Sequence, residues 1–248
     1  VSTTGAHSKV AVISDLHFPY HDRVALANVL AFLKELQPDI VVLNGDIFDF
    51  YQISKFDKNP KRADGLQSDI DMGRAFLSEL RQALPNAVIY FNEGNHEFRM
   101  TRFLWSAAAP LSSLRCLQLE NLLTLKDYNI TLVPSEKGIM VNGVFLIIHG
   151  DISSIHSGYT AKRMYEKHGG NGVGGHCHRL GSFLKRDRFG THGWYEGGCL
   201  CQLNPDYITN PNWVQGLTLV DFFGKHFLTE SLPIINGRFI YGGKYYGS

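Results

Sequence analysis

The sequence predicts an α/β protein that combines a parallel sheet with antiparallel hairpins. Two observations indicate this: short apolar runs alternate with helical patterns over residues 9–91, and glycine-containing turns separate apolar runs after residue 139. A strand–helix–strand–helix–strand order is typical of parallel strands joined by right-handed crossovers. No linker, internal repeat or low-complexity stretch interrupts the 248 residues, so we predict a single domain over residues 1–248.

The first half contains three short apolar runs that predict buried strands, with two helical patterns between them. Apolar residues on both faces are typical of a strand that is covered on both sides. A proline close after each helical pattern marks its end. In chain order the expected elements are a strand at Lys9–Ser14, a helix at Val24–Leu36, a strand at Ile40–Leu43, a loop at Ser54–Gln67, a helix at Ile70–Leu84 and a strand at Ala87–Phe91.

The second half changes from helix to strand. Residues 97–127 have an irregular helical pattern with Pro110 inside it. Ile139–Ile148 carries Asn142-Gly143 between apolar runs, which predicts a β-hairpin. Two further hairpin regions are expected at Lys185–Trp194 and Gly216–Ile240, with turns near Gly190, Gly224 and Asn236-Gly237.

Composition excludes several classes of protein. The 24 Lys and Arg against 23 Asp and Glu give a net charge of +1, which excludes an overall basic coat for nucleic acid. Apolar runs such as Val144–Ile148 are too short to span a membrane, and Val1–Lys9 lacks the pattern of a secretion signal. The cysteines at 116, 177, 199 and 201 form no C-x-x-C motif, and we expect Cys199 and Cys201 to be buried small residues. We therefore expect a cytoplasmic protein with no membrane partner.

Polar side chains follow five apolar or glycine-rich runs at the points where strands are expected to end. These segments are Asp15-Leu16-His17, Gly45-Asp46-Ile47-Phe48-Asp49, Gly94-Asn95-His96-Glu97, His149-Gly150-Asp151 and Gly175-His176-Cys177-His178. Each one alone is typical of a strand cap, a turn or a core histidine. Together they indicate a ligand site, because open α/β sheets bind ligands beyond the carboxyl ends of their strands.

The residue types in these segments suit transition metals. Aspartate and asparagine supply oxygen and histidine supplies nitrogen, a donor set that favours Mn, Fe, Zn or Co over Ca or Mg. Seven such ligands are too many for one ion and suit two ions with one bridging carboxylate. Two ions ~3.5–4 Å apart can generate hydroxide and hold the attacking and leaving oxygens of a phosphoryl displacement in line.

The five segments, in this order over residues 15–178, resemble those of the calcineurin-like metallophosphoesterases. The resemblance implies a four-layer αββα sandwich of two mixed β-sheets flanked by helices. It also implies two divalent transition-metal ions, Mn²⁺ first, with Fe, Zn, Ni or Co as alternatives. Carried over by motif, the first ion would take Asp15, His17 and His178, the second Asn95, His149 and His176, and Asp46 would bridge them.

The resemblance assigns catalytic roles to two further residues. His96 would contact the phosphate and protonate the leaving oxygen, and Asp49 would orient His96 and favour its charged form. In the phosphoprotein phosphatase branch an arginine follows this second aspartate, but here the residue is Phe50. Arg99, Arg102 and Arg179 lie near the motifs and are candidates to replace it.

We predict a phosphoesterase that acts on diesters of nucleotide or nucleic-acid type. Two cationic segments could contact such a substrate: Lys185, Arg186 and Arg188 among aromatic residues, and the loop with Lys55, Lys58, Lys61 and Arg62. Asn212-Trp213-Val214-Gln215-Gly216 is similar to a tail of phage-encoded members. The alternatives are a monoesterase of small molecules or phosphoproteins, a non-catalytic scaffold of the same fold, and a zinc amidohydrolase, which the hairpins argue against. The sequence leaves the natural substrate and the oligomeric state open.

Overall fold

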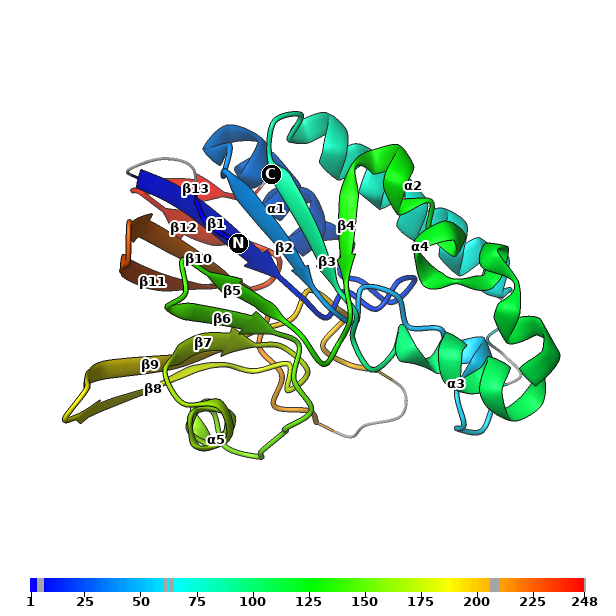
Figure 1. Cartoon of the computed structure of the whole chain (residues 1–248). Coiled ribbons are helices and arrows are strands. Elements are labelled where there is room, and N and C mark those ends of the chain that lie inside the picture. Colours follow the sequence, from blue (N-terminus) through cyan, green and yellow to red (C-terminus); the bar gives the residue numbers. More distant parts are fainter. Residues whose placement is uncertain (4–6, 60–61, 63–64, 206–209, 248) are drawn as a thin grey trace.

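Two mixed β-sheets form the centre of the molecule (Figure 1). The computed structural model describes residues 1–3, 7–59, 62, 65–205 and 210–247. The first sheet has the strand order β11-β10-β1-β2-β3-β4, in which β1 to β4 are parallel and β10 and β11 form an antiparallel hairpin beside β1. Its strands are β1 (His7–Ile13), β2 (Ile40–Asn44), β3 (Val88–Asn92), β4 (Ile130–Val133), β10 (Gly216–Phe223) and β11 (His226–Pro233).

The second sheet has the order β5-β6-β7-β9-β8. In it β6, β7 and β9 are parallel, whereas β5 and β8 are antiparallel edge strands. Its strands are β5 (Ile139–Val141), β6 (Phe145–Ile148), β7 (Asn171–Gly174), β8 (Leu180–Asp187) and β9 (Gly190–Gly197). A separate two-stranded sheet contains β12 (Phe239–Tyr241) and β13 (Lys244–Tyr246).

Helices cover the outer faces of the two sheets (Figure 1). The helices α1 and α2 lie on the first sheet, and α5 lies on the second. The α-helices are α1 (Arg23–Leu36), α2 (Leu66–Ala83), α3 (Phe98–Ala107), α4 (Leu119–Leu122) and α5 (Tyr159–His168), and the 3₁₀ turns are η1 (Tyr51–Ile53), η2 (Ala109–Ser113), η3 (Arg115–Leu117) and η4 (Leu125–Tyr128). None of the helices in the described ranges is both long enough and apolar enough to cross a membrane.

Alternation along β1 shows why four layers form. Val10 and Val12 belong to an apolar cluster between the sheets, together with residues of β5, β6 and β7. Ala11 and Ile13, on the opposite face, belong to a second cluster with α1 and α2. A third cluster packs Met164 of α5 against the outer face of the second sheet. The αββα sandwich is therefore confirmed, and the apolar runs of β1 and β2 are covered on both sides, as the sequence predicted.

The structure confirms the parallel order β1-β2-β3 and the hairpin at Asn142-Gly143, where φ is 50° and 71°. It corrects other details. The second helix, α2, begins at Leu66, directly after Gly65 and inside the segment that was expected to be a loop. The irregular region divides into short helices, and Pro110 lies at the start of η2, where a missing N–H costs nothing. Asn236-Gly237 forms a tight turn between the bridged residues Ile235 and Arg238, but the last strand pair turns later, between Tyr241 and Lys244.

Candidate metal centre

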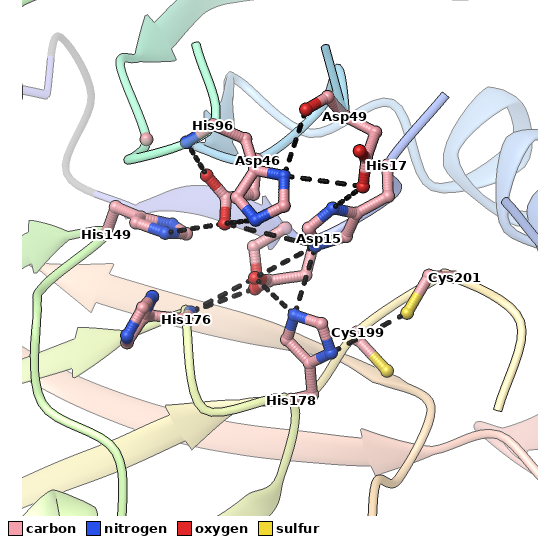
Figure 2. Close-up of polar contacts among 12 residues, drawn as sticks. Asp15, His17, Asp46, Asp49, His96, His149, His176, His178, Cys199 and Cys201 are labelled. Carbon is pink, nitrogen blue, oxygen red and sulfur yellow. Dashed lines mark hydrogen bonds and ion pairs between the residues drawn. The ribbon is translucent and has the colours of Figure 1, made fainter. Parts of the chain in front are cut away.

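The carboxyl ends of β1, β2, β3, β6 and β7 bring the predicted ligands together between the two sheets (Figures 1 and 2). Close backbone approach makes this possible. A Cβ atom on Gly45 would lie 2.6 Å from the ring of His149, and one on Gly94 would lie 2.2 Å from Asp46 Oδ1. These two motif glycines therefore provide the space in which the ligand side chains lie.

A first cluster contains Asp15, His17 and His178, whose donor atoms all lie within 4.8 Å of one another. The Nε2 atoms of the two histidines are 3.0 Å apart, and Asp15 Oδ1 lies 3.1 Å from His178 Nε2. All three side chains are almost fully buried. Two ring nitrogens and one carboxylate oxygen thus point to a common position, which is a donor set suited to a transition-metal ion.

A second cluster contains Asp46, His149, His176 and Asn95. Asp46 Oδ2 lies 3.3 Å from His149 Nε2, and Asn95 Oδ1 lies 2.7 Å from His176 Nδ1 and 3.2 Å from His149 Nε2. Asp46 Oδ2 is also 3.9 Å from His17 Nε2 in the first cluster. The carboxylate of Asp46 therefore lies between the clusters, in the position that a bridging ligand requires (Figure 2).

The electrostatics of the two clusters suit cations. Burial alone lowers the pKa of an imidazole, but the Asp46 carboxylate raises the pKa of His149 to about 10, and Asp15 raises that of His178 to about 9. Despite their own burial, Asp15 and Asp46 have pKa values well below the usual range because of these histidines. The carboxylates are therefore ionised, and a bound ion would replace the protons on the rings.

Five of the predicted ligands have an unusual backbone conformation. Asp15, His17, Asp46, His176 and His178 all have φ between 50° and 65°. In non-glycine residues this conformation costs of order 1–3 kcal/mol each, and it concentrates at functional sites. The backbone is held in the left-handed region at the points where side chains must turn toward the centre.

His96 and Asp49 lie beside the ligands, with Arg99 next to them. The ring Nδ1 of His96 is 3.1 Å from the Asp49 carbonyl oxygen and 3.3 Å from Asp49 Oδ2. Arg99 Nη2 lies 2.9 Å from His96 Nε2. Because a guanidinium can only donate, Nε2 accepts this bond and the ring proton is on Nδ1. Asp49 Oδ2 also lies 3.1 Å from His17 Nδ1, so one carboxylate orients both His96 and a candidate ligand.

A comparison with known protein families matches the part of the chain that carries these motifs. The model of the family described as calcineurin-like phosphoesterase matches residues 8–197, a range that holds all the candidate ligands. The chain belongs to this family.

Two phage proteins and one bacterial enzyme are similar in sequence to this phosphoesterase family member. The chain is 30% identical to the Gene 54 protein of Mycobacterium phage L5 over 253 residues, which cover 95% of this chain and 97% of that protein. It is 29% identical to the Gene 54 protein of Mycobacterium phage D29, with the same coverage. It is also 30% identical to a UDP-2,3-diacylglucosamine hydrolase of Photorhabdus laumondii over 144 residues, which cover 56% of this chain and 46% of that enzyme.

Two solved structures are similar at low sequence identity. One is Vacuolar Protein Sorting 29 from Cryptosporidium parvum, with a TM-score of 0.48 and 13% identity over 98% of this chain and 99% of that one. The other is a dimetal phosphatase from Danio rerio, with a TM-score of 0.47 and 11% identity over 90% of this chain and 95% of that one.

The three arginines that were candidates to replace the missing phosphate-binding arginine have different environments. Phe50 is fully buried and stacks on Phe48, so position 50 cannot contact a substrate. Arg179 is also buried and bonds Asn212 Oδ1 at 2.6 Å and Ser153 Oγ at 3.2 Å. Arg102 is exposed on α3. Of the three, Arg99 is the one in contact with His96.

Sequence reasoning gave no role to Glu97 or to Cys201. Glu97 is fully buried and accepts three backbone N–H groups from the loops that carry Asp46 and Asn95. Cys201 Sγ lies 3.8 Å from His178 Nδ1, behind a candidate ligand. Cys199 and Cys201 are buried, as expected, but with His178 they also form a third group of potential metal donors. The sequence signal for this donor group was the two-residue spacing of the cysteines, which places both side chains on one face of an extended chain.

Proposed function

We propose that the protein hydrolyses phosphodiesters of nucleotide or nucleic-acid type, using two divalent ions of which Mn²⁺ is the first candidate. The observation that carries the proposal is the position of Asp46 Oδ2, 3.3 Å from His149 Nε2 and 3.9 Å from His17 Nε2. Asp15, His17 and His178 would hold one ion, and Asn95, His149 and His176 the other. When bound, two ions activate water and neutralise charge on the phosphoryl oxygens.

His96, positioned by Asp49 and Arg99, would protonate the leaving group. Asp49 keeps the ring in place by accepting from Nδ1, so Nε2 points to the cavity. In the free protein Arg99 donates to this nitrogen. A phosphoryl oxygen is a stronger acceptor for a guanidinium than a neutral imidazole is. Substrate binding would therefore draw Arg99 Nη2 away from His96 Nε2, which would take up a proton from solvent and donate it to the leaving oxygen.

Two features favour a diester. First, Phe50 is buried and supplies no guanidinium, so Arg99 is the guanidinium that contacts His96, and a diester carries one negative charge where a monoester carries up to two. Second, the cavity beside His96 has a volume of about 610 Å³ and is walled in part by Tyr51 and Phe56. It has room for an organic leaving group beyond the phosphate.

Arg99 also gives a specific reason to consider a monoesterase, because its Nη atoms could hold two oxygens of a monoester. Turnover of bis-p-nitrophenyl phosphate and of p-nitrophenyl phosphate, at saturating Mn²⁺ and with metal content measured on the same sample, separates the two functions. We expect about two ions per chain and a higher kcat/KM for the diester. A large preference for the monoester would establish the alternative, and a protein that binds two ions but turns over neither compound would refute both.

A further inference from the structure

A groove continues from the cavity beside His96 along the surface of α3. The cavity and the groove share Phe56, Asn95 and Arg99, so they form one continuous depression. The groove has a volume of about 340 Å³ and lies between α3 and the segment Ile53–Phe56. Together, the cavity and the groove lead from His96, the residue expected to protonate the leaving group, toward the C-terminal end of the helix.

One face of α3 forms a wall of this groove. Arg99, Arg102, Phe103 and Ser106 line it, at positions i, i+3, i+4 and i+7, which lie on the same side of a helix. The residues from Arg99 to Ser106 extend over about 10 Å of helix. Leu104 is buried and anchors the helix to the protein, so the wall is held in a fixed orientation.

The groove combines positive charge with exposed aromatic rings. Among the described residues, the side chains that line it include three cations, Lys55, Arg99 and Arg102, and no carboxylate. Phe56 is 72% exposed and Phe103 is 40% exposed, although both are large apolar rings. Arg99 lies over the ring of Phe56, with 6.0 Å between the guanidinium and the ring centroid. The net charge of the protein is only +1, so this is a local concentration of cations.

We propose that this groove binds a single-stranded nucleic acid on the leaving-group side of the scissile phosphate. Cations that follow the backbone, together with rings on which bases stack, are the two features by which proteins bind single strands without reading sequence. Phe56 and Phe103 would stack bases, and Lys55 and Arg102 would contact phosphates. The proposal rests on the proposed phosphodiesterase function and specifies its substrate class.

A second cationic and aromatic surface, at the turn between β8 and β9, lies far from the centre. The strand β8 begins at Leu180, two residues after the candidate ligand His178, and runs away from it for eight residues. At about 3.3 Å per residue this places the turn with Arg188 and Phe189 roughly 25 Å along the strand. Phe189 is 76% exposed and Arg188 lies over its ring. This hairpin matches the groove in composition but not in position, and it therefore supplies control variants.

Single variants at the far end of the groove test the proposal. In Phe103→Ala we expect kcat/KM for a 12-nucleotide single strand to fall about 5- to 160-fold, the range for loss of one stacked base. In Arg102→Ala we expect weaker binding and a plot of log affinity against log salt that is shallower by about 0.7, as for one lost phosphate contact. Turnover of bis-p-nitrophenyl phosphate, which is too short to reach these residues, should change less than twofold. Phe189→Ala and Arg188→Ala should match the wild type in every assay.

Binding of a fluorescent, phosphorothioate-linked 12-mer to the metal-loaded protein separates this proposal from the proposed function. If bis-p-nitrophenyl phosphate is not hydrolysed but Phe103→Ala still weakens 12-mer binding, the groove is supported and the catalytic function fails. If the diester is hydrolysed and both groove variants bind and cleave the 12-mer as the wild type does, the groove proposal is wrong. Equal affinity for a duplex of the same length would also overturn it, since paired bases cannot stack on these rings.

Discussion

Glu97 holds the backbone of Asp46 in place: Glu97 Oε2 accepts the Asp46 N–H at 2.9 Å. The same carboxylate accepts the N–H groups of Gly94 and Phe48, also at 2.9 Å. It therefore joins the loop after β2, which carries the bridging ligand, to the loop after β3, which carries Asn95 and His96. Burial and the nearby Asp46 carboxylate raise the pKa of Glu97 to about 7.

Replacing Glu97 by glutamine should loosen the metal centre. The new NH₂ group would face a backbone N–H, leaving buried donors unpaired at a cost of about 1–3 kcal/mol. We expect a lower thermal unfolding midpoint for Glu97→Gln and less than two ions per chain by elemental analysis. Glu166→Gln is the matched control, because Glu166 pairs with Lys162 on an exposed face of α5 and such pairs contribute little. A wild-type midpoint with full metal content in Glu97→Gln would show that Glu97 has no positioning role.

Asp46→Asn should be the most damaging change among the ligands. Its carboxylate lies between both clusters, whereas His176 belongs to the second cluster alone. We expect Asp46→Asn to contain less than one ion per chain and His176→Ala to keep about one, measured after the same dialysis. Equal metal content in the two variants would contradict a bridging role for Asp46.

His96→Ala should keep its metal and lose turnover. General acid catalysis contributes about 10²–10⁴-fold, so we expect a loss of that size for substrates with alkyl or nucleoside leaving groups. The loss should be smaller for p-nitrophenol, which needs little protonation. His96 Nε2 also lies 3.8 Å from Asp46 Oδ2, and the two residues form a fourth group of potential metal donors with His17. Metal depletion in His96→Ala would therefore reassign the residue as a ligand.

Asp49→Asn should give a mixed defect, since its carboxylate contacts both His96 and His17. Asparagine offers one neutral oxygen, and its NH₂ group must face either the two rings or Arg99 Nη1, which also donates. The orientation of His17 is therefore weakened, a type of change that typically costs 10–100-fold in metal affinity. We expect weaker binding of one ion together with a turnover defect that depends on the leaving group. Titration with Mn²⁺ followed by kinetics at saturation separates the two effects. A variant with normal Mn²⁺ affinity would restrict Asp49 to orienting His96.

Metal binding should release protons and strengthen with rising pH. In the ion-free protein the pKa of His149 is about 10 and that of His178 about 9, against burial, because of Asp46 and Asp15. Both rings are therefore protonated at pH 7 and must lose a proton to bind an ion, so apparent affinity rises as pH approaches these values. Calorimetric titration in two buffers of different ionisation enthalpy measures the protons released. Identical heats in both buffers would show that no proton leaves.

Much of the fold was predictable because its signals are local. The apolar runs of β1, β2 and β3, the helix α1 and the Asn142-Gly143 turn each depend on a few neighbouring residues. The strand β4 and the helix α5 were not predicted. The strand β4 is a four-residue edge strand in which Thr131 interrupts the apolar residues and only Ile130 is buried, and α5 buries only three residues.

The sequence by itself determined which residues could meet at the metal centre. Parallel strands place their carboxyl ends at one edge of a sheet, so motifs after successive strands lie near one another once the strand order is known. The nine predicted site residues do lie together in the structure. The roles given to Arg99 and Glu97, and the sharing of Asp49 between His17 and His96, could not be deduced in this way.

Only the tertiary structure decided those contacts. Arg99 reaches Asp49 across 50 positions of the chain, and Glu97 reaches Phe48 across 49. Such bonds depend on how β2, β3 and α3 pack, which no local pattern encodes. The groove beside α3 has the same origin: its basic and aromatic residues come from two segments that are ordinary in sequence and become a continuous surface only when the helix lies against Ile53–Phe56.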